Sequence, residues 1–153
     1  MTAEQMKRLT LEQLQELHQH PERIPSQICW LLETLTSDNE ELRAWATDCI
    51  QELPALDDPS AAEVAAYCQH KNQFVANRAC LTLEKATNLP QFQDSLAQAL
   101  VSHASIGVRQ SAAATLGALT TANPATRKAL TAAAESSDAR LQRLAKVALE
   151  KLT

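Results

Sequence analysis

Four segments of the chain align without gaps, and each begins 33 residues after the one before it. They are NEELRAWATDCIQEL from Asn39, NQFVANRACLTLEKA from Asn72, SIGVRQSAAATLGAL from Ser105 and DARLQRLAKVALEKL from Asp138. Self-similarity at a period of about 20–50 residues is typical of stacked repeats, in which each unit buries its apolar face against the next. This period limits the possible folds more than any other feature of the sequence.

Equivalent positions in the four segments carry side chains of the same kind. The first position holds Asn, Ser or Asp, whose side chains accept the free N–H groups at a helix start. Apolar residues follow at spacings of three, four, four and three residues, which places them on one face of an amphipathic helix. The four columns are Leu42, Val75, Val108 and Leu141; Ala46, Ala79, Ala112 and Ala145; Ile50, Leu83, Leu116 and Leu149; and Leu53, Ala86, Leu119 and Leu152. The alanine column and the nearby Gly117 predict that neighbouring helices approach to about 8 Å.

A partner helix is expected before each of these segments. The partners begin near Ile24, Asp58, Leu89 and Asn123, and Pro59 and Pro124 fit the first helical position, where a missing N–H costs nothing. The segment LTLEQLQELHQH follows the pattern only in part, with Gln13 in place of the alanine, and is predicted to be a capping helix. The sequence therefore predicts one all-α domain, residues 1–153, folded as a right-handed α–α superhelix whose second helices line the inner face. It comprises a cap at 1–22 and four two-helix repeats at about 23–55, 56–88, 89–121 and 122–153.

The chain resembles the HEAT-repeat family of helical solenoids from about Ile24 to Leu152. The likeness is carried by the pattern in DNEELRAWATDCIQEL and SIGVRQSAAATLGAL, where Leu42-Arg43 and Val108-Arg109 match the apolar–arginine pair that opens the family's second helix. The arginine is replaced by Ala76 in the second unit and by Gln142 in the fourth, so the sequence does not support a continuous arginine–aspartate ladder.

Composition and targeting features favour a cytoplasmic protein. No run of some 18 apolar residues could span a membrane. The first residues are charged and amphipathic, unlike a secretory signal peptide. Cys29, Cys49, Cys68 and Cys80 include no Cys-x-x-Cys pair, so reduced and mostly buried thiols are expected rather than a zinc site.

Histidines and aromatic residues offer little support for catalysis. His70 and His103 are also 33 residues apart, and the simplest role for them is donation or positive charge near a helix C-terminus. Some HEAT-repeat enzymes are hydroxylases that bind metal through His-Glu pairs, which this chain lacks. HEAT-like DNA glycosylases instead use aromatic and carboxylate groups, as Trp45 and Asp48 could, although Trp45 lies beside the predicted core. Trp30, Trp45, Tyr67, Phe74 and Phe92 are all expected to be packing residues. The chain is therefore expected to have no catalytic residues, no cofactor and no metal ion.

Charge is distributed unevenly along the chain. Residues 33–63 contain nine acidic side chains and one arginine, whereas residues 64–153 contain ten basic and five acidic side chains. This polarity is compatible with a plain solvated surface, with selection of a partner of complementary charge, or with phosphate binding by the basic end. Nucleic acid is the least favoured partner, because no aromatic side chains alternate with these bases.

The favoured function is that of a non-catalytic scaffold or adaptor that binds another protein. An enzyme or enzyme subunit built on the same repeats and a nucleic-acid phosphate binder remain the alternatives. Helical phase places the contact residues on the outward side of the second helices, and it predicts that glutamine is tolerated at Ala44 and Ala113. The candidate contact residues are Ala44, Thr47, Asp48, Gln51, Asn77, Cys80, Gln110, Ala113, Arg143 and Lys146.

Overall fold

The protein is all-α throughout the part that the computed structural model describes, which is residues 8–152. Nine α-helices lie within it: α2 (Leu11–Gln19), α3 (Ile28–Thr34), α4 (Glu40–Gln51), α5 (Asp58–Tyr67), α6 (Gln73–Thr82), α7 (Gln93–Ser102), α8 (Ile106–Leu116), α9 (Pro124–Ala133) and α10 (Ala139–Lys151). Short 3₁₀ helices occur at Pro21–Arg23, Pro25–Gln27, Leu83–Lys85 and Leu89–Phe92. The prediction of an all-α fold is confirmed.

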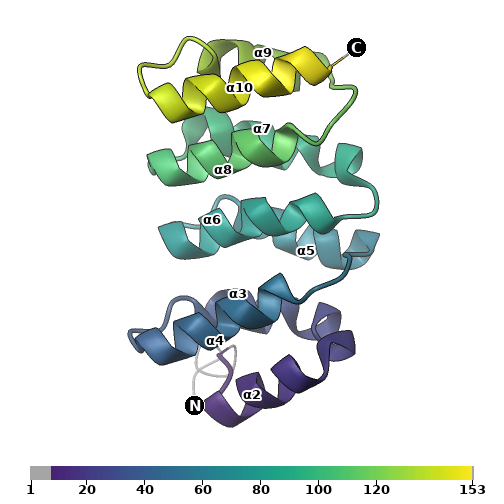
Figure 1. The fold of residues 1–153 in the computed structure, drawn as a ribbon, viewed down its shortest axis with the longest axis vertical. Coiled ribbons are helices and arrows are strands. Elements are labelled where there is room, and N and C mark those ends of the chain that lie inside the picture. The colour runs from purple at the N-terminus through teal and green to yellow at the C-terminus, as the bar shows by residue number, and fades with distance from the viewer. Residues whose placement is uncertain (1–7, 153) are drawn as a thin grey trace.

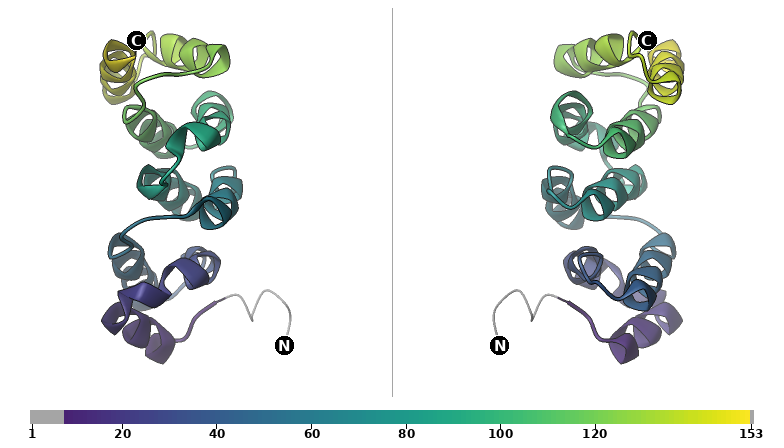
Figure 2. Two further views of the ribbon diagram at one scale, coloured as in Figure 1. Left: turned by 90° about the vertical axis from the view of Figure 1, so that its right-hand side faces the viewer. Right: turned by 90° about the vertical axis from the view of Figure 1, so that its left-hand side faces the viewer.

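The helices lie in layers along the long axis of the molecule (Figure 1). The helices α2, α4, α6, α8 and α10 form one column, and α3, α5, α7 and α9 form a second column beside it (Figure 2). Contacts join the two helices of one layer, in the pairs α3–α4, α5–α6, α7–α8 and α9–α10, and successive helices along each column. We call α4, α6, α8 and α10 the second helices, and α3, α5, α7 and α9 the first helices.

All four second helices start at the predicted interval. Their first residues are Glu40, Gln73, Ile106 and Ala139, and each follows its capping residue directly. The side chains of Asn39, Asn72, Ser105 and Asp138 accept backbone N–H groups from the first turn. These N-caps confirm the sequence prediction, because local side-chain chemistry is enough to fix where a helix begins.

The alanine column is buried as expected. Ala46, Ala79, Ala112 and Ala145 are all 0% exposed and belong to one continuous apolar core. Gly117 has a different explanation from the one predicted. A Cβ atom there would meet the Ala114 carbonyl oxygen at 3.0 Å, and its nearest contacts all belong to the end of the same helix. The close approach at Gly117 is therefore within its own turn.

The first helices differ from the prediction at their N-terminal ends. Asp57, not Asp58, caps α5 through the backbone N–H of Ser60, so Pro59 occupies the second helical position. Pro124 does occupy the first position of α9. The segments that begin near Ile24 and Leu89 form 3₁₀ turns before α3 and α7, and each of these turns has proline in its first two positions. Proline lacks an N–H group and fits the first turn of a helix, whereas the hydrogen-bond register of that turn depends on tertiary contacts.

Helix α2 packs on α4 at one end of the column, as Figure 1 shows. Leu14 and Leu17 are buried there, and the Cys49 thiol donates to the Leu14 carbonyl at 3.3 Å. Gln13 takes the place of the repeat alanine because it completes a capping box with Thr10. The predicted cap at 1–22 includes residues 1–7, which lie outside the described residues.

Lys85 joins the C-terminal ends of two successive second helices. Its ammonium group donates to the carbonyl oxygens of Gln51 at 2.8 Å and Leu53 at 2.6 Å, at the end of α4. Beside it, Leu56 and Ala86 form an isolated parallel bridge that links the two chain segments leaving α4 and α6. A cation at this place also interacts favourably with the helix dipole.

Replacing Lys85 with methionine should therefore destabilise the protein by about 1 kcal/mol, because the carbonyls at the end of α4 lose a charged donor. Urea unfolding followed by circular dichroism measures the change, and the same substitution at exposed Lys128 is the control. Equal stability changes in the two variants would show that Lys85 does not stabilise the junction.

Candidate interaction surface

The candidate contact residues divide into three groups. Ala44, Asp48, Gln51, Arg143 and Lys146 are exposed, as predicted. Thr47, Asn77 and Gln110 are half-buried and already bonded within the protein: Thr47 to the Arg43 carbonyl, Asn77 to Ser111, and Gln110 to the Asp138 carboxylate at 2.9 Å.

Cys80 and Ala113 do not face outward, so the prediction for these two positions is wrong. Both are 0% exposed. The reason is that α6 and α8 lie between neighbours on both sides, which widens the buried arc of each helix. The carbonyl of Cys80 accepts the Thr115 hydroxyl of α8 at 2.8 Å. Lys146, at the equivalent position of α10, remains exposed because α10 packs against only one other second helix.

We call the surface formed by the exposed side chains of α4, α6, α8 and α10 the second-helix face. Its members used below are Ala44, Asp48, Gln51, Phe74, Arg143 and Lys146. The face is not evenly packed. Polar side-chain bonds link α6 to α8 and α8 to the start of α10. Ala44 occupies the position on α4 that Asn77 occupies on α6, and its methyl group cannot form such a bond.

A hollow of about 390 Å³ lies between α4 and α6. We call it the α4–α6 groove, and its lining residues are Leu35, Glu40, Arg43, Ala44, Thr47, Asp48, Phe74, Asn77 and Arg78. The ribbon of α4 diverges from that of α6 toward the N-terminal ends of the two helices (Figure 1). The lining residues of α6 lie in its N-terminal part, so the groove lies away from the C-terminal ends joined by Lys85.

Phe74 projects at the edge of this groove. It is 56% exposed, so the prediction that it is a packing residue is wrong. The Arg43 guanidinium lies 5.9 Å from the centre of its ring, within range of a cation–π contact. Phe92 is buried, and Trp30, Trp45 and Tyr67 pack half-buried against the core, as expected for packing residues. Phase alone could have identified Phe74, because it lies one residue before the buried Val75.

Sequence reasoning did not select Arg43, Phe74 and Arg78 as contact residues. In the sequence, Arg43 stands out only as part of the apolar–arginine pair of the repeat. In the structure, its Nη1 donates to the Ser37 carbonyl at 2.8 Å in the turn before α4. Arg78 lines the groove from α6, and Asp48 lines it from α4. No local motif marks Arg43 or Arg78 as a groove residue, since the hollow that they line lies between two helices.

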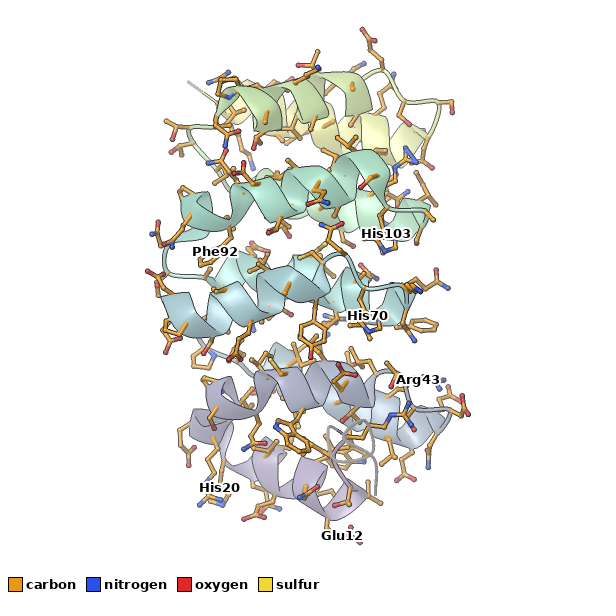
Figure 3. All side chains as sticks on the ribbon, turned by 180° about the vertical axis from the view of Figure 1, so that it is seen from behind. Glu12, His20, Arg43, His70, Phe92 and His103 are labelled. Carbon is orange, nitrogen blue, oxygen red and sulfur yellow. The ribbon has the colours of Figure 1, made fainter. Side chains whose placement is uncertain are left out.

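The two histidines that lie 33 residues apart belong to a turn that recurs before each second helix. His70 and His103 each accept the backbone N–H of the following N-cap residue through Nδ1, at 3.0 Å. The hydroxyls of Ser37 and Ser136 do the same in the other two repeats. Because Nδ1 of His103 accepts, its Nε2 carries the proton and donates to the His70 carbonyl at 3.0 Å. The two side chains lie above one another in successive layers (Figure 3), and each orders the turn before a second helix.

The cysteines are free thiols within the described chain, and three of the four are buried. Cys29 is half-buried on α3, where it donates to the Glu63 carboxylate at 3.1 Å. Burial and the nearby Glu63 carboxylate raise the pKa of Cys29 to about 12. Burial likewise raises the pKa of Tyr67, whose hydroxyl donates to Glu33 at 3.0 Å. These bonds join α3 to α5 and keep both groups protonated at neutral pH.

Between residues 8 and 152, no cluster of three or more His, Cys, Asp and Glu side chains is arranged to hold a metal ion. Within the same residues, no helix combines the length and apolar character needed to cross a bilayer.

The comparisons with known proteins add no family. No protein-family model matches the chain. No curated protein matches its sequence.

Proposed function

We propose that the chain is a right-handed α–α superhelix of the HEAT-like kind. The layered helix pairs and the regular start of the second helices support this architecture. Arg43, which belongs to the apolar–arginine pair of the HEAT pattern, bonds the turn between the two helices of its own repeat. In such an array each unit contacts its neighbours, and the stack presents one extended surface.

We further propose that the protein is a non-catalytic scaffold that binds another protein through the second-helix face. The observation that carries this proposal is the α4–α6 groove with the exposed ring of Phe74 at its edge. Aromatic residues and arginine are enriched in protein–protein interfaces, and a concave hollow lets a partner side chain be removed from water. Ala44, Asp48 and Gln51 extend the surface along α4.

Affinity capture from the native cell, followed by quantitative mass spectrometry, tests this proposal. The bait variant Phe74→Ala combined with Ala44→Arg should lose specific partners at least tenfold, because it removes the aromatic anchor and fills the groove. The matched control is Val101→Ala, which removes an exposed apolar side chain (65% exposed) from a first helix. A partner captured equally by the wild type and both variants would contradict binding through the second-helix face.

A further inference from the structure

The two walls of the α4–α6 groove differ in how their charged groups are satisfied. On the α4 wall, the Arg43 guanidinium already donates to the Ser37 carbonyl and covers the Phe74 ring. On the α6 wall, the Arg78 guanidinium has no hydrogen-bond or ion-pair partner among residues 8–152, although it lies half-buried in the groove. Arg78 is therefore the groove cation that uses none of its donors within the described chain, which leaves all of them available to a ligand.

Half-burial makes this arginine a costly group in the unbound protein. Burial lowers the pKa of Arg78, because the charged guanidinium has lost part of its surrounding water. A guanidinium presents five N–H donors in a planar fork that matches a carboxylate in two parallel bonds. A carboxylate that entered the groove would replace the water that Arg78 has lost.

The groove acids lie at its rim. Glu40 and Asp48 are both exposed on α4, and neither is within salt-bridge distance of Arg78. Interactions of exposed charges are weakened by water and salt, whereas a half-buried charge acts through a lower effective dielectric. The interior of the groove therefore favours an anion, although its rim adds a smaller opposing field.

An apolar contact is available next to this cation. The Phe74 ring stands at the edge of the groove, and the methyl group of Ala44 and the buried side chain of Leu35 line it. The site thus combines one bidentate donor with an apolar surface a short distance away. A ligand that fits both parts carries a carboxylate beside an apolar side chain.

We propose that the α4–α6 groove binds a segment of a partner protein in which an Asp or Glu side chain pairs with Arg78 while a neighbouring apolar side chain packs on Phe74. This inference rests on the proposed scaffold function and names the chemistry of the partner. The segment is protein rather than nucleic acid, because Glu40 and Asp48 would repel a run of phosphates along the groove rim.

Selection of a phage-displayed random dodecapeptide library against the full chain tests the proposal. Enriched peptides should carry Asp or Glu within two positions of an aromatic or large aliphatic residue. Synthetic copies of the enriched peptides should bind Arg78→Gln about tenfold to a hundredfold more weakly, as expected for loss of a charged hydrogen-bonded pair. Phe74→Ala should also weaken binding, and Asp48→Asn should strengthen it by about two- to fivefold, because a like charge leaves the rim.

Two further measurements separate binding from folding. Urea unfolding should show that Arg78→Gln is at least as stable as the wild type, because the substitution removes a half-buried charge that bonds to no group within the described chain. Arg78→Lys keeps the charge but loses the fork, so its affinity should lie between the two. In ¹H–¹⁵N spectra, the peptide should shift the amide signals of α4 and α6 more than those of α9.

Enrichment of basic or uncharged peptides would overturn the proposal, as would acidic peptides whose affinity is unchanged in Arg78→Gln. Failure to enrich any peptide would overturn it too. The scaffold proposal would still stand after any of these outcomes if the bait that carries Phe74→Ala and Ala44→Arg captured fewer partners from the cell than the wild type. If the peptide selection failed and the bait variant also kept its partners, the scaffold proposal itself would be rejected.

Discussion

Replacing Leu116 with alanine should lower the free energy of unfolding by about 2–5 kcal/mol. Leu116 lies fully buried on α8, which is covered by α6 on one side and α10 on the other. The substitution deletes buried methyl groups and leaves a cavity that helices packed on both sides cannot fill. Urea unfolding monitored by circular dichroism gives the change, provided that the slope of the transition stays constant.

The repeat supplies a matched control for this measurement. Leu149 occupies the equivalent position on α10 and is only half-buried, because α10 has one second-helix neighbour. Leu149→Ala should therefore cost clearly less than Leu116→Ala. Equal costs would show that burial is not set by the number of neighbouring layers, and would contradict the stacked arrangement of the second helices.

Enlarging the alanine column should also destabilise the protein. Ala112→Leu is expected to cost about 1–3 kcal/mol, since the added atoms have no space at a position that is 0% exposed. Leucine and alanine have similar helix propensities, so the helix itself is affected little. Thermal or urea unfolding of the purified variant measures the loss.

Three consecutive alanines on α8 provide matched controls for this substitution within one helix. Ala112 and Ala113 are buried, whereas Ala114 is exposed. Leucine at Ala113 should cost as much as at Ala112, and leucine at Ala114 should change stability by less than about 0.5 kcal/mol. Glutamine at Ala113 is now expected to be strongly unfavourable, because its amide would be buried as well as oversized. If Ala114→Leu were as damaging as Ala112→Leu, the assignment of the buried face would be wrong.

The sequence was sufficient for features that depend on local chemistry. The capping side chains of Asn39, Asn72, Ser105 and Asp138 fix the starts of the second helices, and the spacing of Ala46 and its equivalents fixes which side faces the core. Both depend on residues within a few turns of one another. Identical requirements in each repeat made them visible as columns.

Features that depend on differences between layers were not predictable in this way. Helical phase gives Cys80 and Lys146 the same orientation, yet only the helix with neighbours on both sides buries the residue. Residue type predicts that Phe74 is a packing residue, but it lies one position before the buried Val75 and is exposed. The groove results from the divergence of α4 and α6, which no column of the repeat encodes.

The constant interval between the starts of the second helices has a consequence for how such a gene can change. Because Asn72 and Ser105 stand at equivalent points, an in-frame loss of residues 73–105 would place Asn72 directly before Ile106. The shortened polypeptide would keep a competent cap in front of an intact α8, and a duplication with the same endpoints would add a layer on the same terms. Recombination can thus lengthen or shorten this molecule by one complete repeat at a time.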